Sequence, residues 1–184
     1  MAVALPVLSR GQSSNVQQLG IGDKVPDLTF SNLVNYTSPV AKLSAFSGKL
    51  VILDFWATWC GTCLKKIPLL DSAQKKFGNR LQILLVSNEG GNPRDEDKVK
   101  AFLEKRQVAG RGSFSLPATT VQNPLLLQLF PHTFIPHYVW ISPQGRVFAI
   151  TSFREMTLAN IEAMLNGCAV AMPVKNDTRL HHPN

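Results

Sequence analysis

Cysteine is scarce in this sequence, with three thiols in 184 residues. Proteins that depend on a disulfide scaffold carry many more, so this class is excluded. Hydrophobic residues make up 45% of the chain and charged residues 17%, which suits one globular domain with its own core. No apolar run approaches the ~20 residues of a transmembrane helix, and repeats, heptads and low-complexity blocks are missing. We therefore expect a chain that, as given, does not span a membrane.

Acidic residues are also few: 12 stand against 19 basic ones, which gives a net charge of +7. The basic residues are spread thinly, for example as the pairs 65–66, 75–76 and 105–106. None of these pairs lies in a run of aromatic residues, as a groove for single-stranded nucleic acid requires. We therefore expect no nucleic-acid partner and only a weak attraction to acidic surfaces.

The N-terminus lacks the basic start of a complete export signal. Residues 1–9, MAVALPVLS, nevertheless resemble the later half of such a signal, because a short apolar patch ends in small residues at a cleavage-like position. We expect export to the periplasm or cell envelope, with the cytoplasm as the alternative. The sequence predicts a truncated signal-like or disordered segment over 1–19, one domain over 20–170, and a tail or linker over 171–184 that includes His181 and His182.

The middle of the chain alternates strand-like and helix-like segments. LVILDFWA (50–57) predicts a buried central strand, and LKKIPLLDSAQKKFG (64–78) predicts a helix that Pro68 kinks. LQILLVS (81–87) predicts the next strand, and Asn92 and Pro93 predict the start of a second helix that runs to about Arg106. Before these segments, residues 22–30 predict a strand segment, followed by a polar turn.

The last third predicts a hairpin and a closing helix. HYVWISPQGRVFAIT (137–151) predicts two strands around the turn 143–145, and Thr157 and Gly167 mark the two ends of the final helix. The predicted order is strand, helix, strand, helix, hairpin, helix. An α/β fold with a mixed sheet, parallel first and antiparallel at the end, follows from this order.

Two of the three cysteines lie three positions apart in FWATWCGTC (55–63). We expect the strand to end at Trp59 and the helix to begin near Cys60, where free backbone amides stabilise a thiolate and make Cys60 the nucleophile. A zinc site would need two more ligands, which Cys168 and scattered histidines supply poorly. A structural disulfide across so short a loop would restrict the unfolded chain little. A redox pair of Cys60 and Cys63 is favoured, and Cys168 is interpreted as a small hydrophobic residue near the end of the domain.

The segment LVILDFWATWCGTC resembles the active site of thioredoxin-like proteins. With its lead-in, LSAFSGKLVILDFWATWC, it is similar to the TlpA/ResA-like branch of thiol:disulfide oxidoreductases, over residues 20–170. The resemblance implies a thioredoxin-like α/β fold, with a central mixed β-sheet flanked by helices on both faces. It also implies that Cys60 attacks, that Cys63 resolves, and that Pro68 is the proline of the kinked helix.

The same resemblance assigns the surroundings of the two sulfurs. Ile135 and Pro136 match a cis-proline dipeptide that lies against the disulfide, where the backbone before the proline pairs with an extended substrate and the proline keeps metals off the thiols. Trp59 shields one side of the site. Asp54 matches a buried acid, and because burial raises the pKa of a carboxyl group, it is expected to accept the proton that Cys63 loses.

Two positions depart from the family pattern. Thr62 stands where thioredoxins usually have proline, and residues between the cysteines help to set the redox potential. His137 follows Pro136, where many relatives carry threonine, and a histidine beside the thiols would stabilise a thiolate. We expect instead that His137 points away along its strand and that His132 is also a structural residue.

The resemblance implies thiol–disulfide exchange, with a redox-active Cys60–Cys63 disulfide and neither a further cofactor nor a metal. We expect a reductase of protein disulfides in the cell envelope, whose partners are protein thiols or disulfides and a membrane thiol-reducing donor. A thiol peroxidase is one alternative, although Thr58 lies only two residues before Cys60, not three as in the peroxiredoxin pattern. A copper-binding thioredoxin-like module is the other, although its usual spacing between the cysteines is one residue longer.

Overall fold

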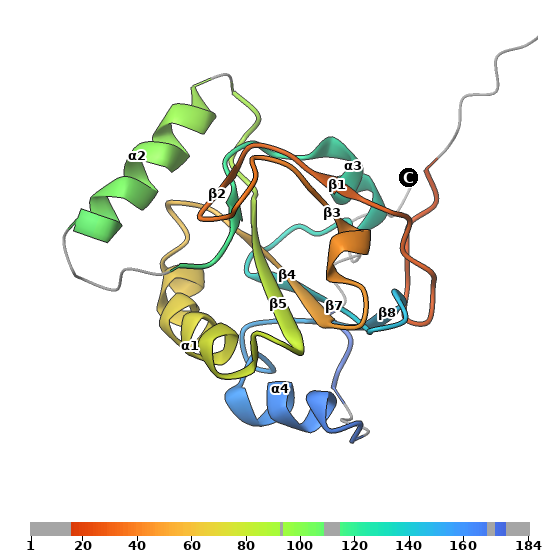
Figure 1. Ribbon diagram of the computed structural model, residues 1–184. Coiled ribbons are helices and arrows are strands. Elements are labelled where there is room, and N and C mark those ends of the chain that lie inside the picture. Colours follow the sequence, from red (N-terminus) through yellow and green to blue (C-terminus); the bar gives the residue numbers. More distant parts are fainter. Residues whose placement is uncertain (1–15, 93, 109–114, 169–171, 176–184) are drawn as a thin grey trace, which may run out of the picture.

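The computed structural model describes residues 16–92, 94–108, 115–168 and 172–175. Within these ranges six strands form one mixed sheet in the order β2-β6-β5-β4-β7-β8 (Figure 1). β1 (Thr29–Phe30) and β3 (Ala41–Lys42) pair separately as a short antiparallel ribbon. The predicted mixed sheet is confirmed, because β4 runs parallel to β5 and antiparallel to β7.

The bounds of the remaining elements follow the chain. The strands of the main sheet are β2 (Leu33–Val34), β4 (Leu50–Trp56), β5 (Leu81–Ser87), β6 (Ala118–Thr119), β7 (His137–Ile141) and β8 (Val147–Thr151). The helices are η1 (Leu43–Phe46, a 3-10 helix), α1 (Gly61–Phe77), α2 (Asp95–Val108), α3 (Pro124–Leu129) and α4 (Leu158–Leu165).

Helices cover both faces of the sheet, as predicted, and each face has its own apolar core. On one face Ile52, Trp56 and Trp140 pack with residues of α1, α2 and α4 and with both cysteines of the motif. On the other face Leu53 and Val139 pack with α3 and η1. We call these the α1 face and the α3 face. Successive residues of β4 and β7 alternate between the two faces because strand side chains alternate, and this alternation decides which polar groups lie near the cysteines.

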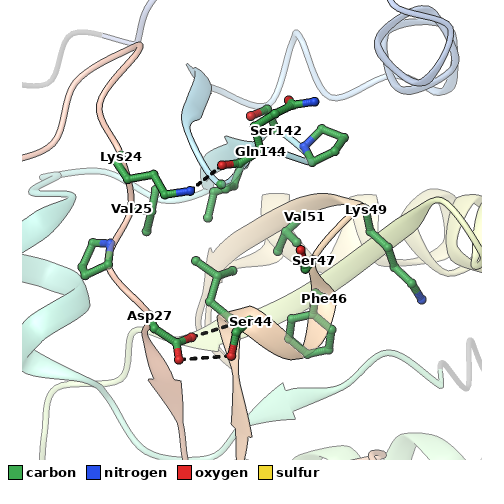
Figure 2. Close-up of a pocket in the computed structure, with 15 residues that line it drawn as sticks. Lys24, Val25, Asp27, Ser44, Phe46, Ser47, Lys49, Val51, Ser142 and Gln144 are labelled. Atoms are coloured by element: carbon green, nitrogen blue, oxygen red, sulfur yellow. Dashed lines mark hydrogen bonds between the residues drawn. The ribbon is translucent and has the colours of Figure 1, made fainter.

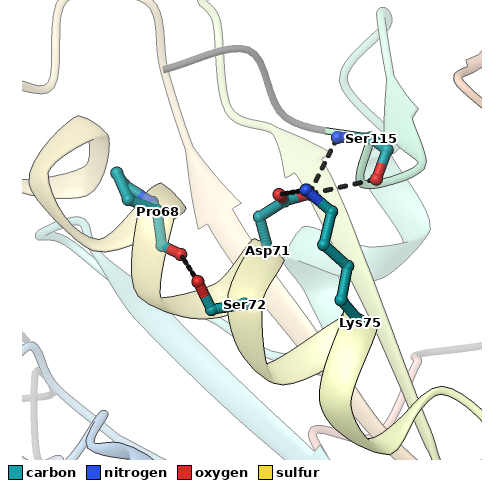
Figure 3. A network of polar contacts seen from close by, with 5 residues as sticks. All are labelled: Pro68, Asp71, Ser72, Lys75 and Ser115. Atoms are coloured by element: carbon teal, nitrogen blue, oxygen red, sulfur yellow. Dashed lines mark hydrogen bonds and ion pairs between the residues drawn. The ribbon is translucent and has the colours of Figure 1, made fainter.

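Pro68 lies inside α1, as predicted, and the same helix carries a buried acid (Figure 3). Asp71 accepts hydrogen bonds from the amide and the hydroxyl of Ser115, at 2.8 and 3.1 Å, and forms an ion pair with Lys75 at 2.6 Å. Burial raises the pKa of Asp71, but the hydrogen bonds from Lys75 and Ser115 outweigh it and hold that pKa below its ordinary value. Asp71 thereby ties α1 to the segment that enters β6.

The hairpin and the last helix form as predicted. β7 pairs with β8 in antiparallel register, and Gly145 in the turn between them has φ +72°, a conformation that favours glycine. The hydroxyl of Thr157 accepts a hydrogen bond from the amide of Asn160 at 3.1 Å and so caps α4. Gly167, with φ +73°, follows the end of this helix.

Two predicted boundaries are wrong. β4 ends at Trp56, not at Trp59, because the amide of Cys60 donates to the carbonyl of Ala57 at 3.0 Å and closes a turn between strand and helix. α2 begins at Asp95 because Asn92 accepts from the two amides that follow Pro93 and forms a turn before the helix.

Several short elements were not predicted. β2 and β6 have two residues each, and α3 has six, so their local patterns are too short to stand out. The expected N-terminal strand over 22–30 is confined to β1, with a single bridge from Lys24 to Arg146. The amide of Lys175 bonds the carbonyl of Ile150 at 2.9 Å, so the beginning of the predicted tail contacts the domain.

Other predictions about the ends lie beyond the described ranges. The signal-like residues 1–9 and the pair His181–His182 lie outside the described residues. The boundaries of the domain at 20 and 170 stay a prediction.

Candidate active site

The two cysteines of the motif form a disulfide at the N-terminus of α1. The Sγ atoms of Cys60 and Cys63 are 2.02 Å apart and their Cα atoms 5.3 Å apart. Cys60 is the residue that caps the helix, and its Sγ accepts a hydrogen bond from the amide of Cys63 at 3.2 Å. Amides of a first helical turn that point at a sulfur stabilise its thiolate, which lowers the pKa of a thiol in this position. Cys63 is fully buried, whereas Cys60 is 6% exposed, so Cys60 is the more accessible sulfur.

The turn before Cys60 is held from the neighbouring strand by a buried acid. Glu89, which follows β5 and is 2% exposed, accepts a hydrogen bond from the amide of Thr58 at 2.6 Å. Its other carboxylate oxygen pairs with Lys98 of α2 at 2.7 Å. Burial raises the pKa of Glu89, but the hydrogen bonds from Lys98 and Thr58 prevail and hold that pKa below its ordinary value. The sequence reasoning missed Glu89, although a lone acid directly after a buried strand was visible.

Ile135 and Pro136 lie at the same end of the sheet as the disulfide. The peptide bond between them is cis, the geometry that the family resemblance implies. His137 lies opposite Phe55 in the register of β7 with β4, so the two preceding residues lie beside the carboxyl end of β4. Ile135 packs against the core cluster that contains both cysteines. Trp59 is 66% exposed, which leaves its indole available next to Cys60.

Asp54 lies on the α1 face in the middle of β4. It falls between Ile52 and Trp56, which belong to the cluster of the two cysteines, and it has no measurable exposure. Burial raises the pKa of this carboxyl well above its ordinary value. Neither of its oxygens has a hydrogen-bond partner among the described residues. The structure therefore provides a buried carboxyl group on the side of the sheet where the cysteines lie.

The two histidines lie on the opposite face. His137 is 2% exposed, its ring stacks on His132 at 4.4 Å, and it meets the edge of Phe55 at 5.4 Å. Burial, followed by the charges of His132 and Lys175, lowers the pKa of His137 to about 2. His137 thus points away from the thiols and stays neutral at physiological pH, as the structural interpretation expects.

Cys168 contradicts its interpretation as a core residue. Its thiol is free and the residue is exposed, because the chain has already left α4 and Gly167 has turned it outward. Within the described ranges no group of three or more His, Cys, Asp or Glu side chains is placed to hold a metal ion. None of the helices described has the length and apolar character needed to cross a membrane.

A cavity of about 320 Å³ lies at the other end of β4 (Figure 2). Lys24 spans its mouth and donates to the carbonyl of Gln144 at 2.5 Å, while Asp27 accepts from the amide and hydroxyl of Ser44. Val51, near the start of the strand, lines it, so the length of β4 separates this cavity from the disulfide. Its polar groups are paired with each other, and it is not part of the site.

Comparisons with known proteins agree with this geometry. ResA, a thiol-disulfide oxidoreductase of Oceanobacillus iheyensis, is 25% identical over 91% of this chain and 82% of its own length. The thioredoxin-like protein YneN of Bacillus subtilis is 32% identical over 50% of this chain and 54% of its own length, so the match spans about half of that relative.

The fold also matches solved structures. A candidate thiol:disulfide interchange protein, DsbE of Chlorobium tepidum, superimposes with a TM-score of 0.63 at 24% identity, over 80% of this chain and 99% of the other. This likeness confirms the predicted thioredoxin-like fold. The model of the AhpC/TSA family matches residues 21–129, which is more than half of the sequence. The chain therefore belongs to the AhpC/TSA family.

Proposed function

We propose that this protein is a thiol:disulfide oxidoreductase that reduces disulfides of other proteins in the cell envelope. The observation that carries the proposal is the Cys60–Cys63 disulfide at the N-terminus of α1, with the amide of Cys63 directed at the Sγ of Cys60. The names of ResA and of the DsbE-type structure support the same reaction class. The disulfide is then the redox-active group, and the reaction needs no further cofactor.

In the reductive direction the Cys60 thiolate attacks one sulfur of a substrate disulfide. A mixed disulfide forms, and the first substrate thiolate leaves and takes up a proton. Cys63 then loses its proton to the Asp54 carboxylate and attacks the Sγ of Cys60. The second substrate thiolate leaves, so the substrate gains two electrons and the protein is left with its own disulfide. A dithiol donor, which we place at the membrane, returns the electrons by the same exchange in reverse.

The groups around the disulfide suit a polypeptide substrate. The backbone of Ile135 is proposed to pair with an extended substrate segment, while Pro136 packs against the sulfurs. Trp59, 66% exposed beside Cys60, offers an apolar surface for the residues that flank a substrate cysteine. These contacts favour protein disulfides over small ones, which touch only the sulfurs.

Trapping of the mixed disulfide tests the mechanism. The experiment is made in a Cys168→Ser background, because the exposed thiol of Cys168 would form adducts of its own. Cys63→Ala should accumulate covalent adducts with protein disulfides that dithiothreitol releases. The matched Cys60→Ala variant should form far fewer, because Cys63 is fully buried. Adducts that form equally in both variants, or in neither, contradict the proposal.

The direction and the location need separate measurements. The equilibrium potential of the Cys60–Cys63 pair in a redox buffer should lie near or below the roughly −270 mV of a reducing thioredoxin, whereas a value near −120 mV indicates a disulfide donor. Fractionation of the host cell should recover the protein outside the cytoplasm. Peroxide consumption and Cu(I) retention are measured in parallel. Efficient peroxide turnover without reduction of protein disulfides would favour a thiol peroxidase instead.

A further inference from the structure

Tyr138 is the strand neighbour of Asp54 beneath the disulfide. The antiparallel register of β4 with β7 places Tyr138 directly opposite Asp54, and side chains in such a pair have Cβ atoms about 4.5–5.5 Å apart. Tyr138 belongs to the same core cluster as Cys60 and Cys63. Both side chains therefore lie on the α1 face, and both have no measurable exposure.

The two side chains are complementary, and neither has another partner. Tyr138 Oη and both Asp54 oxygens have no hydrogen bond within the described part of the chain. A buried polar group without a partner costs about 1–3 kcal/mol, and an ionised carboxylate without a partner costs more. When Asp54 ionises, a donor on the same face relieves this cost. A phenol can donate to a carboxylate, which can only accept.

The other groups that face Asp54 do not provide such a donor. Its partner on β5 is Leu85, which is apolar, and Thr151, the partner of Tyr138 on β8, is already engaged by the indole of Trp140 at 2.8 Å. From α1 the titratable neighbours are the two cysteines of the site. His137 faces the other side of the sheet, and Glu89 and Lys98 are paired with each other.

Trp56 is the competing donor on this face. Its Nε1 is also buried without a partner among the described residues, but its ring is directed toward α2, where it packs against Phe102 at 5.8 Å. Tyr138 lies within electrostatic reach of Asp54, because the carboxylate charge adds to burial in raising the pKa of the phenol. The phenol thus keeps its proton and is always able to donate.

We propose that Tyr138 is a positioning residue of the site, which donates a hydrogen bond from its phenol to the Asp54 carboxylate after that group has ionised. The inference rests on the proposed function, in which Asp54 takes the proton of Cys63. In that step the Cys63 thiol and the Asp54 carboxylate become a thiolate and a carboxylic acid, and no other reactant is needed. Tyr138 stabilises the carboxylate beforehand and so sets the lowest pH at which the acceptor is available.

Removing the hydroxyl tests this role. Tyr138→Phe should shift the titration of Asp54, followed by the NMR signal of its carboxyl carbon, upward by about one pH unit. The resolving step, measured as release of a substrate from a preformed mixed disulfide with Cys60, should move its pH profile by the same amount. At a pH below that titration the step should slow by up to about tenfold. Tyr36→Phe is the matched control, because Tyr36 lies against Phe46 in the α3-face core, and it should change neither measurement.

A second measurement needs no variant. In the wild-type protein the Cζ signal of Tyr138 should titrate with the same midpoint as Asp54, while that of Tyr36 should not. An Asp54 titration that is unchanged in Tyr138→Phe, or an indole signal of Trp56 that follows Asp54 while Tyr138 does not, overturns the inference. A wild-type protein that reduces no protein disulfide at any pH overturns the proposed function instead, and the NMR titrations still decide the role of Tyr138.

Discussion

Replacing Glu89 by alanine should destabilise the protein more than its position outside the helices and strands suggests. Glu89 is 2% exposed and joins two parts of the molecule, the turn that leads into Cys60 and helix α2. The alanine variant leaves the amide of Thr58 without its acceptor and Lys98 without its partner. The glutamine variant keeps an oxygen for Thr58 and loses only the charge.

The magnitude follows from these two contacts. A hydrogen bond to a charged group contributes about 1.5–3 kcal/mol. The Lys98 ammonium is 49% exposed, so water replaces most of its lost interaction and the pair itself adds less than about 1 kcal/mol. We therefore expect Glu89→Ala to lower the free energy of unfolding by about 2–3 kcal/mol and Glu89→Gln by about 1 kcal/mol. For a chain of this size the alanine variant should melt about 4–12 °C lower.

Urea unfolding of the oxidised protein at pH 7, read by far-UV circular dichroism, measures these differences. The matched control is Glu162→Gln, which removes a surface ion pair with Lys76 at 3.5 Å in which both side chains are half exposed, and it should cost less than about 0.5 kcal/mol. The pKa of Glu89 is held below its ordinary value, so its stabilisation is present at neutral pH and disappears as the pH falls through that lowered pKa. An alanine variant as stable as the control would refute the reasoning.

Three further predictions concern other residues. Asp71→Asn should lower the free energy of unfolding at pH 7 by about 1–2 kcal/mol, because it weakens the bonds to Ser115. Since the pKa of Asp71 is lowered, the difference from wild type in acid titrations of stability should vanish as the pH falls through that pKa. Trp59→Ala should slow the reduction of a protein disulfide such as that of insulin several-fold, and a small aromatic disulfide reagent should react at the wild-type rate. Cys168→Ser should leave both rates unchanged, whereas a loss of exchange would implicate this exposed thiol.

The parts of the site that follow from local sequence were predictable. The apolar run before the cysteines is β4, and Cys60 caps the helix that begins at Gly61. Both features depend on contacts within a few residues, because a buried strand needs apolar side chains and a helix start needs a group that accepts its free amides. The three-residue error at the end of β4 is of the same local kind. Trp59 is aromatic and suits a strand, but the turn from Ala57 to Cys60 overrides that preference.

The contacts between strands were not predictable from single segments. Glu89 reaches Thr58 across 31 residues of sequence, and nothing near either residue indicates the other. α3 was missed because its six residues are too few for a helical period. Its one local signal is Asn123, which accepts from the amide of Leu125 at 3.0 Å and precedes a proline, a combination typical of a helix start.

The register of β7 decides which ionisable side chain lies under the disulfide. Pro136 lies immediately before the strand, His137 is its first residue and Tyr138 its second. Because side chains alternate, a shift of one residue would exchange their faces. The imidazole of His137 would then lie next to Asp54, and a cation there would favour the carboxylate much more strongly than a neutral phenol does. In the observed register His137 is buried against Phe55 and His132, and the neutral phenol of Tyr138 faces the acid. The carboxyl group therefore keeps a raised pKa, and a raised pKa is what lets it take a proton from a thiol.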